Sequence, residues 1–367
     1  MKLILLALSF VLSAPVWALS VTTYNTGIAH NFVGLAKERV PFITKELSNF
    51  KTDVLCLQEV WDKKDRKTVM KALEKDYPFV HTVDMKMKRA DKAPTCHIKQ
   101  LFGKDKFVTC ALTTCKGTEG DEYTDCILNK CEQPLKTLIA DDRQCATALM
   151  SAVDKSSLGA IATVLNPFVR APLFAYGGSN GLILLSKKKF AKTSYIDWTE
   201  DSTLNRRGAL VATLVGGETV YCTHLTANQT SIPYTGKFAS WEEENKFQVE
   251  ALVSDALDHR EGALIMGDFN ISPNLPEYGI EGDFEANYSV FEDAGLEASV
   301  NFNANPQCTF CKSNTLVGGG KDMLLDHIFS TGLNPISTTR VFDRKVTIEG
   351  KEENLSDHFG LHMNFAD

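Results

Sequence analysis

The chain has 367 residues, of which 44% are hydrophobic and 23% charged, a composition ordinary for a globular enzyme. It contains no internal repeat and no low-complexity tract, which excludes repeat and disordered architectures. The formal net charge of -7 at pH 7 excludes a broadly basic nucleic-acid-binding surface. The net charge does not exclude a nuclease, because a metal ion can screen phosphate charge locally.

The first 18 residues have the pattern of a secretory signal peptide. Lys2 is followed by an unbroken apolar run, and small residues stand at Ala14 and Ala18. The run is shorter than the roughly 20 apolar residues of a membrane-spanning helix. We therefore expect cleavage near Ala18, a mature domain of residues 19–367, and secretion into an extracellular or periplasmic space.

The next segments alternate between strand and helix patterns. Residues 20–24 predict a strand, residues 32–50 have apolar side chains at helical spacing, and residues 52–61 contain a short buried strand. Another amphipathic helix is predicted over residues 241–260. The order of strand, helix and strand indicates a layered α/β core.

Further apolar strand patterns are spread over the rest of the chain. They cover residues 181–186, 209–215, 219–225, 263–269, 324–330 and 360–365. Many strands with few helices favour one domain, built as a two-sheet sandwich flanked by helices, over a parallel doubly wound sheet.

One region interrupts this pattern and is interpreted as an insertion of residues 89–178. Six of the ten cysteines lie in it: Cys96, Cys110, Cys115, Cys126, Cys131 and Cys145. Disulfides are the default expectation in an exported chain, and their pairing is left open. Residues 158–178 are apolar and fit either a cap packed on the body or a surface for peripheral membrane contact.

Cys308 and Cys311 form a CTFC pair that could be half of a zinc site. No second pair lies at zinc-ribbon spacing, and an oxidising compartment favours a disulfide. A disulfide is therefore the preferred interpretation of this pair.

Polar side chains stand at the ends of several apolar strands. They are Asn25, Glu59, His224, Asp268, Asn270, Asp326, Asp357 and His358. Each fits a turn cap or a structural residue when taken singly, but strand ends reach a common cleft, so we expect the set to converge. Several buried carboxylates are costly without a cation, and oxygen ligands suit Mg²⁺, with Mn²⁺ or Ca²⁺ as alternatives.

The chain also contains seven short motifs in a fixed order: YN, QEV, SNG, THL, GDFN, LDH and SDH. In this order they resemble the endonuclease/exonuclease/phosphatase superfamily, which includes pancreatic-type deoxyribonuclease, inositol polyphosphate phosphatases and neutral sphingomyelinases. The resemblance spans roughly residues 20–365 apart from the insertion. It implies an α/β fold, a four-layer α/β/β/α sandwich with the site at one edge of the two sheets.

The resemblance implies roles for the residues around the metal and the water. Glu59 would ligate Mg²⁺ directly, with Asn25 and Asp357 completing the network around the ion. Asp326 would accept a hydrogen bond from His358 and fix its tautomer. His358 would then be the general base that takes a proton from water.

Three more residues would contact the reacting groups. Asp268 would orient the attacking water or help at the leaving oxygen, and Asn270 would donate to a phosphate oxygen. His224 would contact the phosphate or protonate the leaving group. His327 is interpreted as structural, because adjacent residues of a strand point to opposite faces.

The sequence leaves the phosphodiester substrate open. A sphingomyelinase-like phospholipase C is favoured, because residues 179–190 resemble a sphingomyelinase segment. A secreted deoxyribonuclease-type endonuclease is the alternative, with basic candidates at residues 86–92, 186–190 and 205–208. An inositol-lipid phosphatase is less favoured, and so is a binding protein without catalysis, because the expected catalytic residues are all present.

Overall fold

The structure is a computed structural model that describes residues 17–84, 96–118, 126–127, 129–152, 155, 157–166, 174–229 and 232–366. Residues 1–16 of the expected signal peptide lie outside these ranges, so cleavage near Ala18 stays a prediction. No helix within the described ranges has both the length and the apolar character to cross a bilayer.

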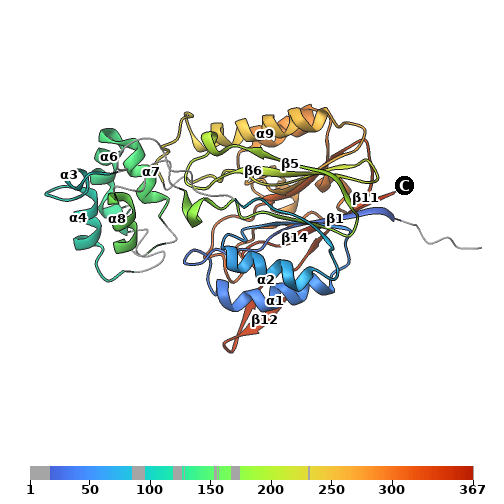
Figure 1. The fold of residues 1–367 in the computed structure, drawn as a ribbon, viewed down its shortest axis with the longest axis horizontal. Helices are drawn as coiled ribbons and strands as arrows, with labels where there is room; N and C mark the ends of the chain where they lie inside the picture. Colours follow the sequence, from blue (N-terminus) through green and yellow to red (C-terminus); the bar gives the residue numbers. More distant parts are fainter. Residues whose placement is uncertain are drawn as a thin grey trace, which may run out of the picture.

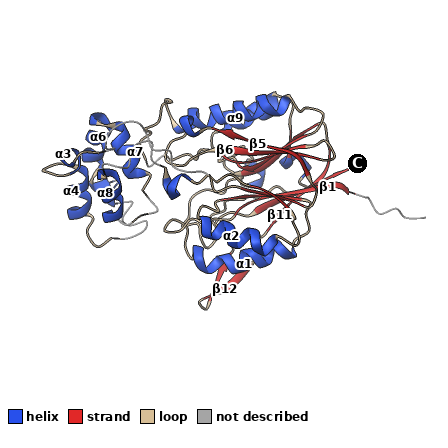
Figure 2. Ribbon diagram, in the orientation of Figure 1, coloured by secondary structure: helices blue, strands red, loops and turns tan. Residues whose placement is uncertain are grey.

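Two six-stranded mixed sheets form the body (Figures 1 and 2). In order across the first sheet, the strands are β11 (Asn334–Val341), β14 (Gly360–Ala366), β1 (Trp17–Asn25), β2 (Val54–Gln58), β4 (Ile183–Ser186) and β3 (Phe79–His81). Across the second sheet they are β5 (Phe190–Asp197), β6 (Gly208–Leu214), β7 (Thr219–His224), β8 (Ala263–Asp268), β10 (Asp326–Thr331) and β9 (Glu297–Ala298). A separate hairpin pairs β12 (Lys345–Ile348) with β13 (Lys351–Asn354).

Helices cover the outer faces of both sheets. Helices α1 (Ala36–Asn49) and α2 (Lys63–Leu73) pack on the first sheet, and helices α9 (Trp241–Leu257) and α10 (Glu285–Asp293) pack on the second. A third apolar core lies between the sheets. The structure thus confirms the predicted four-layer α/β/β/α sandwich.

Burial explains which strands the sequence revealed. All residues of β2 and β8 are buried, because each sheet has a layer on either face, so these strands are continuous apolar runs. Every predicted strand and helix is present, with ends that differ by a few residues. The edge strands β5 and β11 were not predicted, because their largely exposed residues give them mixed sequences.

The region interpreted as an insertion forms a group of helices at one end of the body (Figure 1). They are α3 (Ile98–Leu101), α4 (Phe107–Thr114), α6 (Glu132–Asp141), α7 (Arg143–Met150) and α8 (Ser157–Leu165). The helices enclose a small core of their own. Three disulfides hold this core: Cys96–Cys145, Cys110–Cys131 and Cys115–Cys126.

The other four cysteines are paired in the body. Cys308 and Cys311 form a disulfide, which confirms the preferred interpretation over zinc. Cys56 of β2 and Cys222 of β7 form another, and it joins the two sheets across the central core. All ten cysteines are therefore oxidised, as expected for an exported chain.

Candidate active site

Three ionisable side chains stand side by side across the second sheet. The parallel strands β7 and β8 place His224 opposite Asp268, and the antiparallel strand β10 places Asp326 opposite Asp268. Each residue is the first or last of its strand, and all three are buried. The register therefore forms a row of functional groups at one edge of the sheet.

The first sheet brings its residues to the same edge. Glu59 is the first residue after β2, and β1, its parallel neighbour, ends at Asn25. Asp357 and His358 precede β14, which is antiparallel to β1. A hydrogen bond joins the two halves of the site, in which Asn25 Nδ2 donates to Asp268 Oδ2 at 2.8 Å.

The loop after β1 requires a glycine. Gly27 has a φ of +55°, and a Cβ there would lie 2.4 Å from Asp357 Oδ1. Its N–H donates to Asn25 Oδ1 at 3.0 Å, and the buried Arg39 donates to its carbonyl at 2.5 Å. The glycine thus allows Asn25 and Asp357 to lie close together.

His358 and Asp326 form a hydrogen-bonded pair. His358 Nδ1 donates to Asp326 Oδ2 at 2.8 Å, and its Nε2 lies 3.7 Å from Asp268 Oδ2. Burial lowers the pKa of His358, but the two carboxylates outweigh burial and raise the pKa well above its ordinary value. The Asp326 carboxylate thus fixes the orientation of the His358 ring and, in the neutral form of the ring, its tautomer.

Asp268 lies at the centre of the site. Its Oδ2 is 3.4 Å from His224 Nε2, in addition to its contacts with Asn25 and His358. Burial raises the pKa of Asp268 to about 6, although the neighbouring His358 acts in the opposite direction. The carboxylate is therefore within reach of both imidazoles.

Glu59 supplies a carboxylate oxygen without a partner. Its Oε2 is buried and accepts no hydrogen bond from any described residue. Burial, and then the nearby Asp357, raises the pKa of Glu59 to about 7. The backbone has a φ of 59°, and such a left-handed conformation costs roughly 1–3 kcal/mol and clusters at functional sites.

These groups fit a hard divalent cation. Asp268, Asp326 and His358 offer ligand atoms within 4.8 Å of one another. Glu59, whose Oε2 has no hydrogen-bond partner among the described residues, interacts electrostatically with Asp268 and His358. Burial is the main cause of the raised pKa values of Glu59 and Asp268, and the neighbouring carboxylates of Asp357 and Asp326 add to it. A cation bound nearby would stabilise the ionised carboxylates. The group of Asp268, Asp326 and His358 differs from the ligand set expected from the sequence, Glu59, Asn25 and Asp357, and that set stays a prediction.

His224 is a neutral imidazole in this environment. Burial, together with the positive charge of Arg207, lowers the pKa of His224 well below its ordinary value. A neutral imidazole donates a hydrogen bond but is a poor proton donor. Contact with phosphate therefore suits His224 better than protonation of the leaving group.

Asn270 and His327 have different hydrogen-bond partners and different surroundings. Asn270 donates its backbone N–H to Asp268 Oδ1 and its Nδ2 to the Leu225 carbonyl, both at 3.0 Å, which leaves one amide proton for a ligand. His327 is fully buried, with Nε2 hydrogen-bonded to the Ile271 carbonyl at 3.0 Å. It lies apart from the site, as the alternation along the strand predicts.

Arg207 is a site residue that the sequence interpretation did not assign. It is 4% exposed, and its Nε and Nη1 find no hydrogen-bond partner among the described residues. Burial lowers the pKa of Arg207 to about 10, while the carboxylates of Asp268 and Glu59 act on it in the opposite direction. In the sequence, the Arg206 and Arg207 pair is indistinguishable from a solvated charge run.

An aromatic wall borders His224. Trp61, two residues after Glu59, stacks on Tyr176 with ring centroids 5.0 Å apart and planes inclined by 10°. The Trp61 ring also lies 5.9 Å from that of His224. Because Tyr176 lies at the end of the insertion, the insertion contributes to a wall beside the site.

The sequence model of the Endonuclease/Exonuclease/phosphatase family matches residues 37–358. The chain belongs to this family. It is a metal-dependent phosphodiester hydrolase, and the match includes every site residue described above except Asn25 and Gly27. A comparison with curated protein sequences finds no match.

Several solved structures share the fold at low sequence identity. Sphingomyelinase C from Streptomyces griseocarneus is 15% identical with a TM-score of 0.54, over 95% of this chain and 99% of that one. A beta toxin mutant from Staphylococcus aureus with bound magnesium ions is 11% identical with a TM-score of 0.52, over 95% and 99%. TDP2 from D. rerio, complexed with a single-strand DNA product, is 13% identical with a TM-score of 0.51, over 95% and 99%.

Proposed function

We propose that the chain is a secreted, Mg²⁺-dependent phosphodiesterase in which His358 activates water, with a phospholipid headgroup as the favoured substrate. The observation that carries the proposal is a convergence of three unlike groups. They are the His358–Asp326 pair, the unpaired oxygen Oε2 of Glu59, and the Nε and Nη1 groups of Arg207, which have no partner among the described residues. Hydrolysis of a phosphodiester needs a base, a cation site and a group that binds the anion.

His358 would take the proton of the attacking water. Because Nδ1 donates to Asp326, His358 in its neutral form carries its lone pair on Nε2, where it accepts the proton as the water oxygen bonds to phosphorus. The carboxylates raise the pKa of His358 in the metal-free site, so a cation bound beside it would favour this neutral form. Asp326 stabilises the resulting imidazolium, and Asp268, 3.7 Å from Nε2, orients the water. The phosphorus bond to the leaving oxygen then breaks, and the alkoxide takes a proton from solvent water, giving a phosphomonoester and an alcohol.

The phosphate itself would be held by three donors. Arg207 contributes a buried positive charge, neutral His224 an N–H, and Asn270 its remaining amide proton. Glu59, with Asn25 and Asp357, would hold Mg²⁺, or Mn²⁺ or Ca²⁺, whose charge polarises the phosphoryl group and offsets charge on the leaving oxygen.

Two observations favour a phospholipid headgroup. Tyr176 is half-buried and keeps aromatic surface near His224, whereas Trp61, on which it stacks, is buried. Aromatic faces bind quaternary ammonium groups such as that of choline. In the insertion, Leu158 of α8 is 73% exposed, which suits peripheral contact with a membrane. The fold shared with sphingomyelinase C over 99% of that chain agrees with this choice.

A secreted nuclease is the second candidate, and the fold shared with DNA-bound TDP2 favours it. The structure weakens one argument for it, because Arg206 and Arg207 of the basic segment 205–208 are buried and form no exposed patch. The basic candidate at residues 86–92 lies outside the described residues. Secretion is supported for either activity by the five disulfides, which persist in oxidising compartments.

The test is a paired assay of the purified mature protein on sphingomyelin vesicles and on plasmid DNA, each with Mg²⁺ or with a chelator. Release of phosphocholine that stops on chelation, without nicking of DNA, is the expected result. Nicking alone would establish the nuclease. Absence of hydrolysis on both substrates, with the protein folded and Mg²⁺ present, would contradict the proposal.

A further inference from the structure

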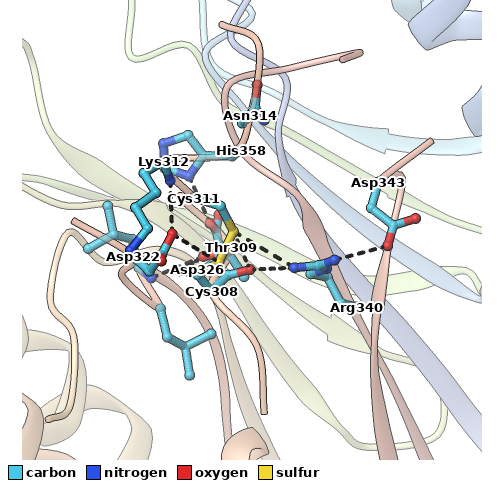
Figure 3. The surroundings of a disulfide bond; sticks show 12 residues. Cys308, Thr309, Cys311, Lys312, Asn314, Asp322, Asp326, Arg340, Asp343 and His358 are labelled. Carbon is cyan, nitrogen blue, oxygen red and sulfur yellow. Dashed lines mark hydrogen bonds and ion pairs between the residues drawn. A yellow bond between two sulfur atoms is a disulfide. The ribbon is translucent and has the colours of Figure 1, made fainter. Parts of the chain in front are cut away.

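The disulfide between Cys308 and Cys311 closes a short turn beside the His358–Asp326 pair (Figure 3). Cys311 is fully buried and Cys308 is half-buried. The turn contains Thr309, which is fully buried, and Phe310. Neither residue belongs to a named strand or helix, but isolated β-bridges pair Phe310 with Met323 and with His358. The disulfide adds a covalent closure to this hydrogen-bonded turn.

Thr309 holds the backbone of Asp326 in place. Its Oγ1 accepts hydrogen bonds from the backbone N–H groups of Leu325, at 3.0 Å, and Asp326, at 3.1 Å. Asp326 is the first residue of β10 and Leu325 directly precedes it, so both bonds hold the start of this strand. One hydroxyl thus fixes the position from which the carboxylate reaches His358.

The same turn holds the other member of the pair. The Thr309 carbonyl accepts from the backbone N–H of Phe359 at 2.8 Å, and Phe310 forms a β-bridge with His358. The Phe310 ring lies 5.1 Å from the His358 ring. The turn therefore contacts both sides of the 2.8 Å hydrogen bond between His358 and Asp326.

Two further contacts anchor the turn. On one side, Arg340 Nη1 donates to the Cys308 carbonyl at 3.1 Å, and Arg340 is in turn paired with Asp343 (Figure 3). On the other side, Asn314 donates its backbone N–H to the Cys311 carbonyl at 2.9 Å. The Asn314 side chain then donates to the Asp357 carbonyl at 3.2 Å, next to His358.

We infer that the disulfide-closed turn of residues 308–311 is a positioning device for the general base, with Thr309 as its central positioning residue. The inference rests on the proposed role of His358. It predicts that loosening the turn changes the rate of the chemical step, because small displacements of a catalytic group are costly, while substrate and metal still bind.

The test compares Thr309→Val with Thr309→Ser. Valine matches the shape of threonine but removes the acceptor for two N–H groups, whereas serine keeps it. We expect Thr309→Val to lower kcat by about ten- to about a hundred-fold, with KM and the Mg²⁺ midpoint close to wild type. Thr309→Ser should keep most of the wild-type kcat, because its hydroxyl still accepts from the two N–H groups.

The double variant Cys308→Ala/Cys311→Ala repeats the test without removing the hydroxyl. Its matched control is Cys115→Ala/Cys126→Ala, which opens a short disulfide loop in the insertion. The inference is supported if kcat falls in Cys308→Ala/Cys311→Ala but not in Cys115→Ala/Cys126→Ala. It is also supported if Thr309→Ser keeps the kcat that Thr309→Val loses. Wild-type kcat in folded Thr309→Val, or in the folded Cys308→Ala/Cys311→Ala variant, overturns it. An inactive wild-type enzyme would instead refute the proposed function.

Discussion

Removal of the metal should make the stability of the protein depend on pH through Glu59. Burial and Asp357 raise the pKa of Glu59 from 4.5 to about 7, so the metal-free folded protein binds this proton more tightly than the unfolded chain does. The stability from this proton is present below the unfolded pKa and is lost as pH rises through about 7. The raised pKa values of Asp268 and His358 act in the same direction.

Buried neutral histidines have the opposite effect on stability, and their effect is confined to low pH. The contribution of Glu59 is therefore best measured above pH 6.5. The pKa of His224 lies well below its ordinary value of 6.5 and that of His327 is lowered to about 4, both by burial. Their contribution to stability is present above 6.5 and is lost as pH falls. Between pH 6.5 and 8 the metal-free protein should therefore lose stability, by about 1 kcal/mol from Glu59 alone.

Mg²⁺ reverses this effect, because it competes with the proton on Glu59. With a pKa of about 7, raising the pH from 6 to 8 should tighten Mg²⁺ binding by about tenfold. For a chain of 367 residues, the Mg²⁺-induced rise in the melting temperature should then be larger at pH 8 than at pH 6 by roughly 2 °C.

The assay is thermal unfolding at pH 6, 7 and 8, with chelator or with a fixed concentration of Mg²⁺. Glu59→Gln is the matched control, because it keeps the shape of the side chain without its titration. The variant should show a small Mg²⁺-induced rise that no longer grows with pH. Equal rises at pH 6 and pH 8 in the wild type, or an unchanged pH dependence in Glu59→Gln, would refute the assignment of Glu59 to the metal.

Three further predictions address other parts of the site. His358→Ala should lower kcat by about 10²- to 10⁴-fold in a protein that folds normally by circular dichroism, and near-normal rates would show that the base lies elsewhere. Arg207→Gln should lower kcat/KM by about ten- to about a hundred-fold and weaken inhibition by phosphate, whereas Arg206→Gln, the neighbouring control, should leave kcat/KM close to wild type. Cys56→Ala/Cys222→Ala should reduce the free energy of unfolding by about 2–5 kcal/mol in urea titrations, and an unchanged value would mean that the disulfide does not stabilise the contact between the sheets.

Residues at the ends of buried strands were the part of the site that the sequence could predict. His224 and Asp268 each follow an apolar run, and a buried strand must be apolar on both faces in this architecture. Glu59 follows β2 for the same reason. Because the sheet register then fixes where strand ends lie, a correct expectation of the strands brought these residues together.

Two residues of interest, Arg207 and Thr309, could not be assigned from the sequence. Arg207 differs from Arg206 only in where the fold directs its guanidinium, which depends on contacts far along the chain. Thr309 has the composition of any turn residue, and its importance arises from two N–H groups 16 and 17 residues away. The partner of Cys56 is 166 residues distant, so spacing carried no information about that pairing.

The site is shared between two sheets, so its geometry depends on what holds the sheets together. Cys56 and Cys222 join them three residues before Glu59 and two residues before His224, and the hydrogen bond from Asn25 to Asp268 joins them again at the edge itself. These links hold carboxylates together that would otherwise repel one another. The fold therefore supplies the free energy that concentrates negative charge at the edge, and the same charge is what gives a divalent cation its affinity there.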